Sequence, residues 1–118
     1  MSDTADILEA FSRLDGVHGA VVLSREGQVR ADHLVDFPDP EGLSEAVHRS
    51  LGVAARLSSC LHQGALTQQA LEFEDSQVIV EILEGDQALA VAAAPTANLG
   101  RIRLELRKNR KAVESSLT

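Results

Sequence analysis

The residues best suited to metal binding are four histidines and a single cysteine. His18, His33 and His48 fall in different predicted elements, and none has a cysteine or a second histidine three or four residues away. His48 and His62 share a predicted helix, but their spacing corresponds to about 21 Å along its axis. A single metal ion cannot bridge that distance. The sequence therefore predicts no metal site.

Motifs for catalysis or cofactor binding are not found either. The segment Gly16-Val17-His18-Gly19 follows a predicted helix, whereas a phosphate-binding loop joins a strand to a helix. The serines do not lie in a strained strand-to-helix turn, and the carboxylates are spread over surface positions rather than paired. We expect no catalytic residues, no cofactor and no enzymatic activity of the chain's own. Cys60 is interpreted as a small buried side chain in a reducing compartment.

Length and charge restrict the class of protein further. With 118 residues and 44% hydrophobic content, the chain is predicted to form one domain over residues 1–118. Its net charge of −7 argues against a nucleic-acid partner, which would require a basic surface. No apolar run approaches the ~20 residues of a membrane span, and the N-terminus is acidic. We therefore expect a cytoplasmic protein that does not insert into membranes.

Positive charge is concentrated at the C-terminal end. Residues 101–118 contain six basic and two acidic residues, so the rest of the chain is strongly acidic. A basic last helix suits its own dipole and would neutralise the acidic first helix if the two lay side by side. These structural roles are preferred to a dedicated anion-binding patch. The basic residues are Arg101, Arg103, Arg107, Lys108, Arg110 and Lys111.

The pattern of apolar residues, caps and turns predicts three helices and five strands. Helical spacing and capping residues place helices at 3–14, 42–63 and 98–116, the second opened by Asp39 and Pro40 and ended by Gly64 at its C′ position. Strands are predicted at 19–24, 28–33, 66–73, 77–83 and 88–94, with a loop at 35–41. Hairpin connections indicate an α+β fold with a five-stranded, mostly antiparallel sheet and helices on both faces.

The central helix carries more apolar surface than one sheet requires. One stripe is predicted to cover the sheet, and a second runs beside it, so that together they exceed the ~100° arc of an ordinary surface helix. Gly52 lies mid-helix, which indicates either tolerated drift or a partner packed closely against Gly52, Val53 and Arg56. The first stripe is Leu43, Val47, Leu51, Ala54, Ser58 and Leu61. The second, a candidate dimer interface, is Ala46, Ser50, Val53, Leu57 and Cys60.

The third predicted strand completes this dimer hypothesis. It lies at a natural sheet margin and lacks the lysine or proline that usually protects an edge. Pairing with a second copy would continue the sheet and bring the two central helices together. We expect Thr67, Gln69 and Leu71 to belong to this interface, and a proline at any of them to disrupt it.

Several segments, in order along the chain, resemble the roadblock (dynein light chain) family and its bacterial MglB members. They are Gly16-Val17 with Gly19-Ala20-Val21-Val22, Arg25-Glu26-Gly27, Gly85-Asp86-Gln87-Ala88-Leu89 and Asn98-Leu99-Gly100. The resemblance implies a profilin-like fold, with the first and last helices on one face and the long helix on the other. It also implies a homodimer whose third strands pair into one continuous sheet.

The resemblance further implies a function. Proteins of this family bind small Ras-like GTPases or serve as dimeric platforms, and MglB proteins bind a GTPase across the paired central helices and accelerate GTP hydrolysis. By position, that surface falls on Arg49, Gly52, Val53, Arg56 and Leu57. The leading hypothesis is therefore a dimeric adaptor or regulator of a Ras-like GTPase. The alternative is a homodimerisation scaffold without a nucleotide-dependent partner.

Overall fold

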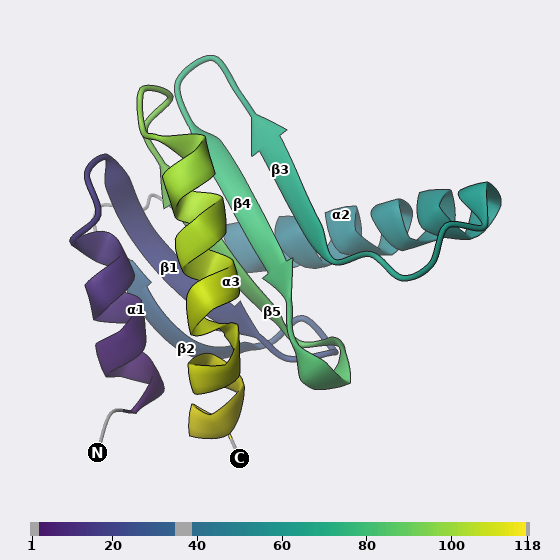
Figure 1. Cartoon of the computed structure of the whole chain (residues 1–118), viewed down its shortest axis with the longest axis horizontal. Helices are drawn as coiled ribbons and strands as arrows, with labels where there is room; N and C mark the ends of the chain where they lie inside the picture. The colour runs from purple at the N-terminus through teal and green to yellow at the C-terminus, as the bar shows by residue number, and fades with distance from the viewer. Residues whose placement is uncertain (1–2, 35–38, 118) are drawn as a thin grey trace.

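The computed structural model describes residues 3–34 and 39–117 and confirms the predicted order of elements (Figure 1). A short 3₁₀ turn, η1 (Glu84–Asp86), replaces the last predicted hairpin loop. No helix in the described part of the chain is long and apolar enough to cross a bilayer. The elements are α1 (Thr4–Ser12), β1 (Val17–Leu23), β2 (Val29–Leu34), α2 (Pro40–Leu61), β3 (Gln68–Glu72), β4 (Gln77–Ile82), β5 (Ala88–Ala93) and α3 (Leu99–Ser116).

The five strands form one antiparallel sheet in the order β2-β1-β5-β4-β3. Figure 1 shows α1 and α3 side by side on one face and α2 on the other, so the α+β class and the layering are as expected. The central strand β5 is buried along its whole length and consists mostly of alanine. Small side chains there let helices approach both faces closely, because a strand's side chains alternate between the faces.

Side-chain caps fix where the helices begin. The carboxylates of Asp3 and Asp39 accept hydrogen bonds from the N–H groups of Asp6 and Gly42 at 2.9 and 3.0 Å. Asn98 does the same for the N–H of Arg101 at 3.0 Å. Since Asp39 is the cap, α2 begins at Pro40, two residues earlier than predicted. Residues 35–38 of the predicted loop lie outside the described residues.

The predicted end of α2 is wrong in one detail. The helix ends at Leu61, and His62, with φ +53°, takes the left-handed conformation that was assigned to Gly64. Gly64 has φ +97° but lies further on, in the connection to β3. A non-glycine residue at this cap carries a steric penalty that glycine would not.

The long helix extends well beyond the sheet. Its 22 residues correspond to about 33 Å, whereas five strands about 4.8 Å apart span only about 19 Å. The C-terminal half of α2 therefore projects past β3, as Figure 1 shows. Leu43, Val47 and Leu51 pack on the sheet as predicted, but Leu61 is 58% exposed. Cys60 is also exposed, so its interpretation as a buried side chain is wrong.

Polar side chains of α3 contact the edge of the sheet that is formed by β3 and β4. Glu81 of β4 is 2% exposed and accepts a hydrogen bond from Nε2 of Gln68 at 2.8 Å. Nε of Arg103 donates to Oε1 of Gln68 at 2.6 Å, and Nη1 of Arg110 lies 3.9 Å from a carboxylate oxygen of Glu81. Among the described residues, no ion pair joins α3 to the acidic side chains of α1. The basic helix therefore lies beside α1 without pairing with it.

Gly19 is a position where β1 tolerates no side chain. A Cβ atom there would lie 2.5 Å from the carbonyl oxygen of His33 and 2.9 Å from Cα of Leu34. Because both are backbone atoms of β2, the strand itself would have to move. We expect Gly19→Ala to lower the free energy of unfolding by about 2–3 kcal/mol in urea denaturation. Gly100→Ala, which meets only an ordinary contact at 3.5 Å, is the control and should not destabilise the protein.

Candidate partner-binding surface

The C-terminal half of α2 presents an exposed apolar flank. Val53 is 70% exposed and Leu57 is 61% exposed, and Ala46 and Cys60 of the same predicted stripe are exposed as well. In the whole helix only Ser44 and Val47 are buried. Large apolar side chains in contiguous exposed positions are typical of surfaces that associate with another chain. The predicted stripe is therefore exposed except at Ser50, which is half-buried.

One hydrogen bond joins this flank to the edge strand. Oγ of Ser50 lies 3.1 Å from Oε1 of Gln69 and 2.8 Å from the carbonyl oxygen of Val47, so its single proton is shared between these two acceptors. Ser50 and Gln69 are thus brought together, as two members of the predicted dimer interface. The bond places Ser50 beside β3, which has a neighbouring strand on one side only.

The exposed edge of β3 is formed by residues other than those predicted. The N–H of Ile82 donates to the carbonyl oxygen of Thr67, and the N–H of Phe73 donates to that of Ser76. Backbone bonding alternates along an antiparallel pair, so Gln69 and Leu71 also direct their backbone groups toward β4. The residues whose N–H and C=O groups face the open edge are Gln68, Ala70 and Glu72. A proline at Gln69 or Leu71 would therefore damage β3–β4 pairing, and Thr67 lies before β3 begins.

The outermost arc of α2 carries two arginines. Arg49 is paired with Glu45 at 2.8 Å, one helical turn away, whereas Arg56 has no ion pair with any described residue. Between them lies Gly52, where a Cβ atom would have no other atom of the described chain within 4 Å outside its own stretch of helix. This arc is open, and no residue in the described part of the chain packs closely enough to explain the glycine.

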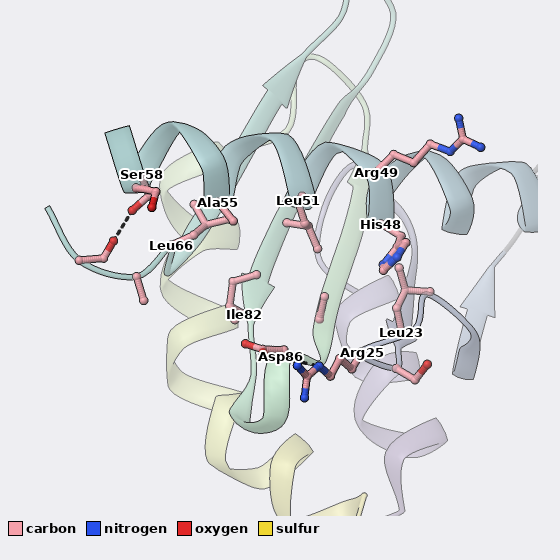
Figure 2. Close-up of a pocket in the computed structure, with 16 residues that line it drawn as sticks. Leu23, Arg25, His48, Arg49, Leu51, Ala55, Ser58, Leu66, Ile82 and Asp86 are labelled. Atoms are coloured by element: carbon pink, nitrogen blue, oxygen red, sulfur yellow. Dashed lines mark hydrogen bonds and ion pairs between the residues drawn. The ribbon is translucent and has the colours of Figure 1, made fainter. Parts of the chain in front are cut away.

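A groove on the opposite flank of α2 was not predicted from the sequence. It has a volume of about 660 Å³ and an apolar floor that includes Leu51, Ala55 and Ile82. Figure 2 shows His48 pointing toward Leu23 at its mouth, while the guanidinium of Arg49 points away. Beyond Leu51 the helix side of the groove is lined by small residues, and the helical spacing of Gly52, Ala55 and Ser59 is the signal in the sequence that could have indicated it.

These surfaces consist mainly of apolar side chains, an open strand edge and exposed cations. Among residues 3–34 and 39–117, no group of three or more histidine, cysteine, aspartate or glutamate side chains is placed to hold a metal ion. Arg25 and Asp86 face each other across the groove mouth at 3.9 Å, but both are mostly exposed, so the pair contributes little. Apolar side chains, an open strand edge and unpaired cations are suited to binding another protein chain.

The family model for the Roadblock/LC7 domain matches residues 3–93. The chain belongs to the Roadblock/LC7 family. Its fold is that of a family of small adaptor and regulatory domains. Uncharacterized protein MJ0714 of Methanocaldococcus jannaschii is 29% identical over 102 residues, which cover 86% of each chain.

Solved structures of this family share the fold at low sequence identity. The Roadblock/LC7 domain from Streptomyces avermitilis has a TM-score of 0.88, with 20% identity over 98% of each chain. Gliding protein MglB from Thermus thermophilus has a TM-score of 0.86, with 20% identity over 97% of this chain and 87% of that one. A further MglB structure, with a TM-score of 0.87, 20% identity and the same coverage, has a tetrameric arrangement.

Proposed function

We propose that this roadblock protein forms a homodimer that acts in the cytoplasm as an adaptor or regulator of a small Ras-like GTPase, with residues 1–118 as a single domain. The observation that carries the proposal is the projecting half of α2, whose apolar flank is exposed beside an open strand edge. An exposed apolar surface of this kind promotes aggregation unless a partner covers it.

A second copy fits both parts of this surface. Antiparallel pairing of β3 with its own copy would satisfy the outward backbone groups of Gln68, Ala70 and Glu72. A two-fold axis beside β3 would bring the exposed flanks of the two α2 helices together, because Ser50 and Gln69 already place that flank at the same edge. The interface would include Ala46, Ser50, Val53, Leu57, Cys60 and the β3 edge.

The GTPase would bind the outer arc of the helix pair. Arg49 points away from the groove, Arg56 is exposed, and both stay outside the proposed interface, with Gly52 between them and Val53 and Leu57 at the border of the interface. Their positive charge would pair with carboxylates on the GTPase. A helix holds these arginines rigidly, so we assign them to anchoring, and any acceleration of hydrolysis to remodelling of the GTPase's own switch residues.

The direct test is a binding assay. The purified protein would be titrated by calorimetry with each Ras-like GTPase encoded in the same genome, loaded with GDP or with a non-hydrolysable GTP analogue. Stronger binding in one nucleotide state supports the regulator. Equal binding in both states favours the alternative, a scaffold without a nucleotide-dependent partner. Absence of binding in both states overturns the GTPase proposal.

Arg56→Ala separates anchoring from catalysis. We expect it to weaken binding of the GTPase about tenfold, because a charge-assisted contact is lost, while the hydrolysis rate of the saturated complex stays within a few-fold. Single-turnover hydrolysis at saturating protein measures that rate. Arg101→Ala, an exposed arginine on the opposite face, is the matched control. A thousandfold lower rate at unchanged affinity would show that Arg56 acts as a catalytic arginine.

A further inference from the structure

The flank of α3 that faces the open edge of the sheet is mainly basic, and its one acid, Glu114, is paired with Arg110 at 3.4 Å. Arg103 and Arg110 on this flank reach Gln68 and Glu81 at the β3–β4 end. Arg107 follows Arg103 by one helical turn and Lys111 follows Arg107 by another, so both lie on the same side. Neither Arg107 nor Lys111 has an ion pair with any described residue. Leu104, 63% exposed, lies next to them.

The turn between β3 and β4 has the opposite character. Phe73, 57% exposed, is flanked by the exposed carboxylates of Glu72, Glu74 and Asp75. None of these three acids forms an ion pair with a described residue. The same chain therefore carries an acidic tip with an exposed aromatic ring and a basic helix flank with an exposed leucine.

We propose that, in the dimer, the acidic β3–β4 turn of each copy docks on the basic β3-facing flank of α3 in the other copy. This inference rests on the proposed pairing of β3 strands. It adds a second, reciprocal contact on the face of the sheet opposite α2.

In an antiparallel pair of β3 strands, the β3–β4 turn of one copy would lie close to the basic flank of α3 in the other copy. The partner's β3 would run in the opposite direction, so its turn would lie beyond the Thr67–Gln68 end of this copy's strand. The second half of α3 lies at the same end, since Arg110 reaches Glu81 and the N–H of Glu84 donates to Oε2 of Glu114 at 2.5 Å. Arg103 of α3 already reaches Gln68 of β3, and the partner's strand would lie about 4.8 Å beyond β3, so the next basic side chains of this flank have one further strand spacing to cover.

A second copy explains the charge better than other anionic partners do. The whole chain carries a net charge of −7, so a nucleic acid would be repelled by most of its surface. A lipid bilayer lying on α3 would also meet α1, whose acidic Asp6 and Glu9 are exposed in the same layer. The acidic turn instead presents three carboxylates and one apolar ring over about four residues, which suits a short basic stretch of helix.

Charge-reversal substitutions on the β3–β4 turn and on the basic flank of α3 test the proposed contact between them. One variant carries Arg107→Glu and Lys111→Glu, and the other carries Glu74→Lys and Asp75→Lys. By sedimentation at low salt, each variant alone is expected to have a dimer Kd about tenfold higher than the natural chain, since like charges would face each other at two symmetric contacts. Native mass spectrometry of an equimolar mixture should show more than the statistical half of heterodimers, because mixing restores both contacts.

A matched control removes the effect of net charge. Arg101→Glu with Lys108→Glu makes the same charge change on the side of α3 that does not face β3, and mixed with the Glu74→Lys, Asp75→Lys chain it should give statistical pairing. If both mixtures are statistical while the natural chain is dimeric, the turn contact is wrong and the dimer stands. If the natural chain sediments as a monomer at micromolar concentration, the proposed dimer fails as well.

Discussion

Ala70→Pro is expected to convert the dimer into a folded monomer. The N–H of Ala70 points to the open edge, so proline removes a hydrogen bond to the second copy without removing one to β4. The preceding residue is already extended, as proline requires. With one bond lost from each copy and a ring blocking close approach, we expect the dimer Kd to rise about a hundredfold. Sedimentation velocity over a dilution series measures it.

Leu71→Pro is the matched control for this edge. It lies one residue further along the same strand, but its N–H belongs to the β3–β4 ladder. We therefore expect a lower melting temperature for Leu71→Pro and a nearly unchanged one for Ala70→Pro. A dimer of natural affinity in Ala70→Pro would show that β3 edges do not pair, and the proposed interface would be abandoned.

Leu57→Asp is expected to abolish association through the helices. Leu57 is mostly exposed in the single chain, so the change removes little packing from the monomer. Full burial of a leucine contributes about 1.5–3 kcal/mol, and each dimer would lose this twice while burying two unpaired carboxylates. The dimer Kd should rise at least about a thousandfold. Analytical ultracentrifugation and circular dichroism together would show a monomer with unchanged helix content.

A second aspartate substitution on α2 serves as the matched control for Leu57→Asp. Ser59→Asp places the same charge in an exposed position near the same helix end, but on the flank that lines the groove. It should leave the dimer Kd within a few-fold of the natural value. Equal dissociation in both variants would mean that charge on α2, rather than loss of the apolar flank, causes the effect.

The sequence alone predicted the fold well, because its evidence was local. Caps at Asp3, Asp39 and Asn98 and the period of apolar residues depend on neighbours within a few positions. The sequence also predicted the excess apolar surface of α2, since Val53 and Leu57 repeat at helical spacing. Their exposure in the structure agrees with that interpretation.

What the sequence could not provide depends on how distant elements meet. Which backbone groups of β3 face outward is decided by its register with β4, so the strand pattern could not distinguish Ala70 from Leu71. Leu61 continues an apolar stripe, yet it is exposed because the sheet is narrower than the helix is long. The groove is formed by residues from four segments, and no single stretch of sequence contains it.

The position of β5 also determines when the protein can fold during its synthesis. β5 is the central strand of the sheet but the last of the five strands in the sequence. It pairs with β1 from the other end of the chain: Val17 lies opposite Ala93, and Leu23 lies opposite Ala88. β1 and β4 cannot acquire their shared neighbour until most of the chain has left the ribosome. Until then, the β1–β2 and β3–β4 hairpins are separate pairs with unpaired edges, and two-stranded hairpins are marginal in water. Nascent chains therefore expose unpaired strand edges until residues 88–93 emerge from the ribosome. Mispairing between copies would begin on polysomes, where several nascent chains are close together.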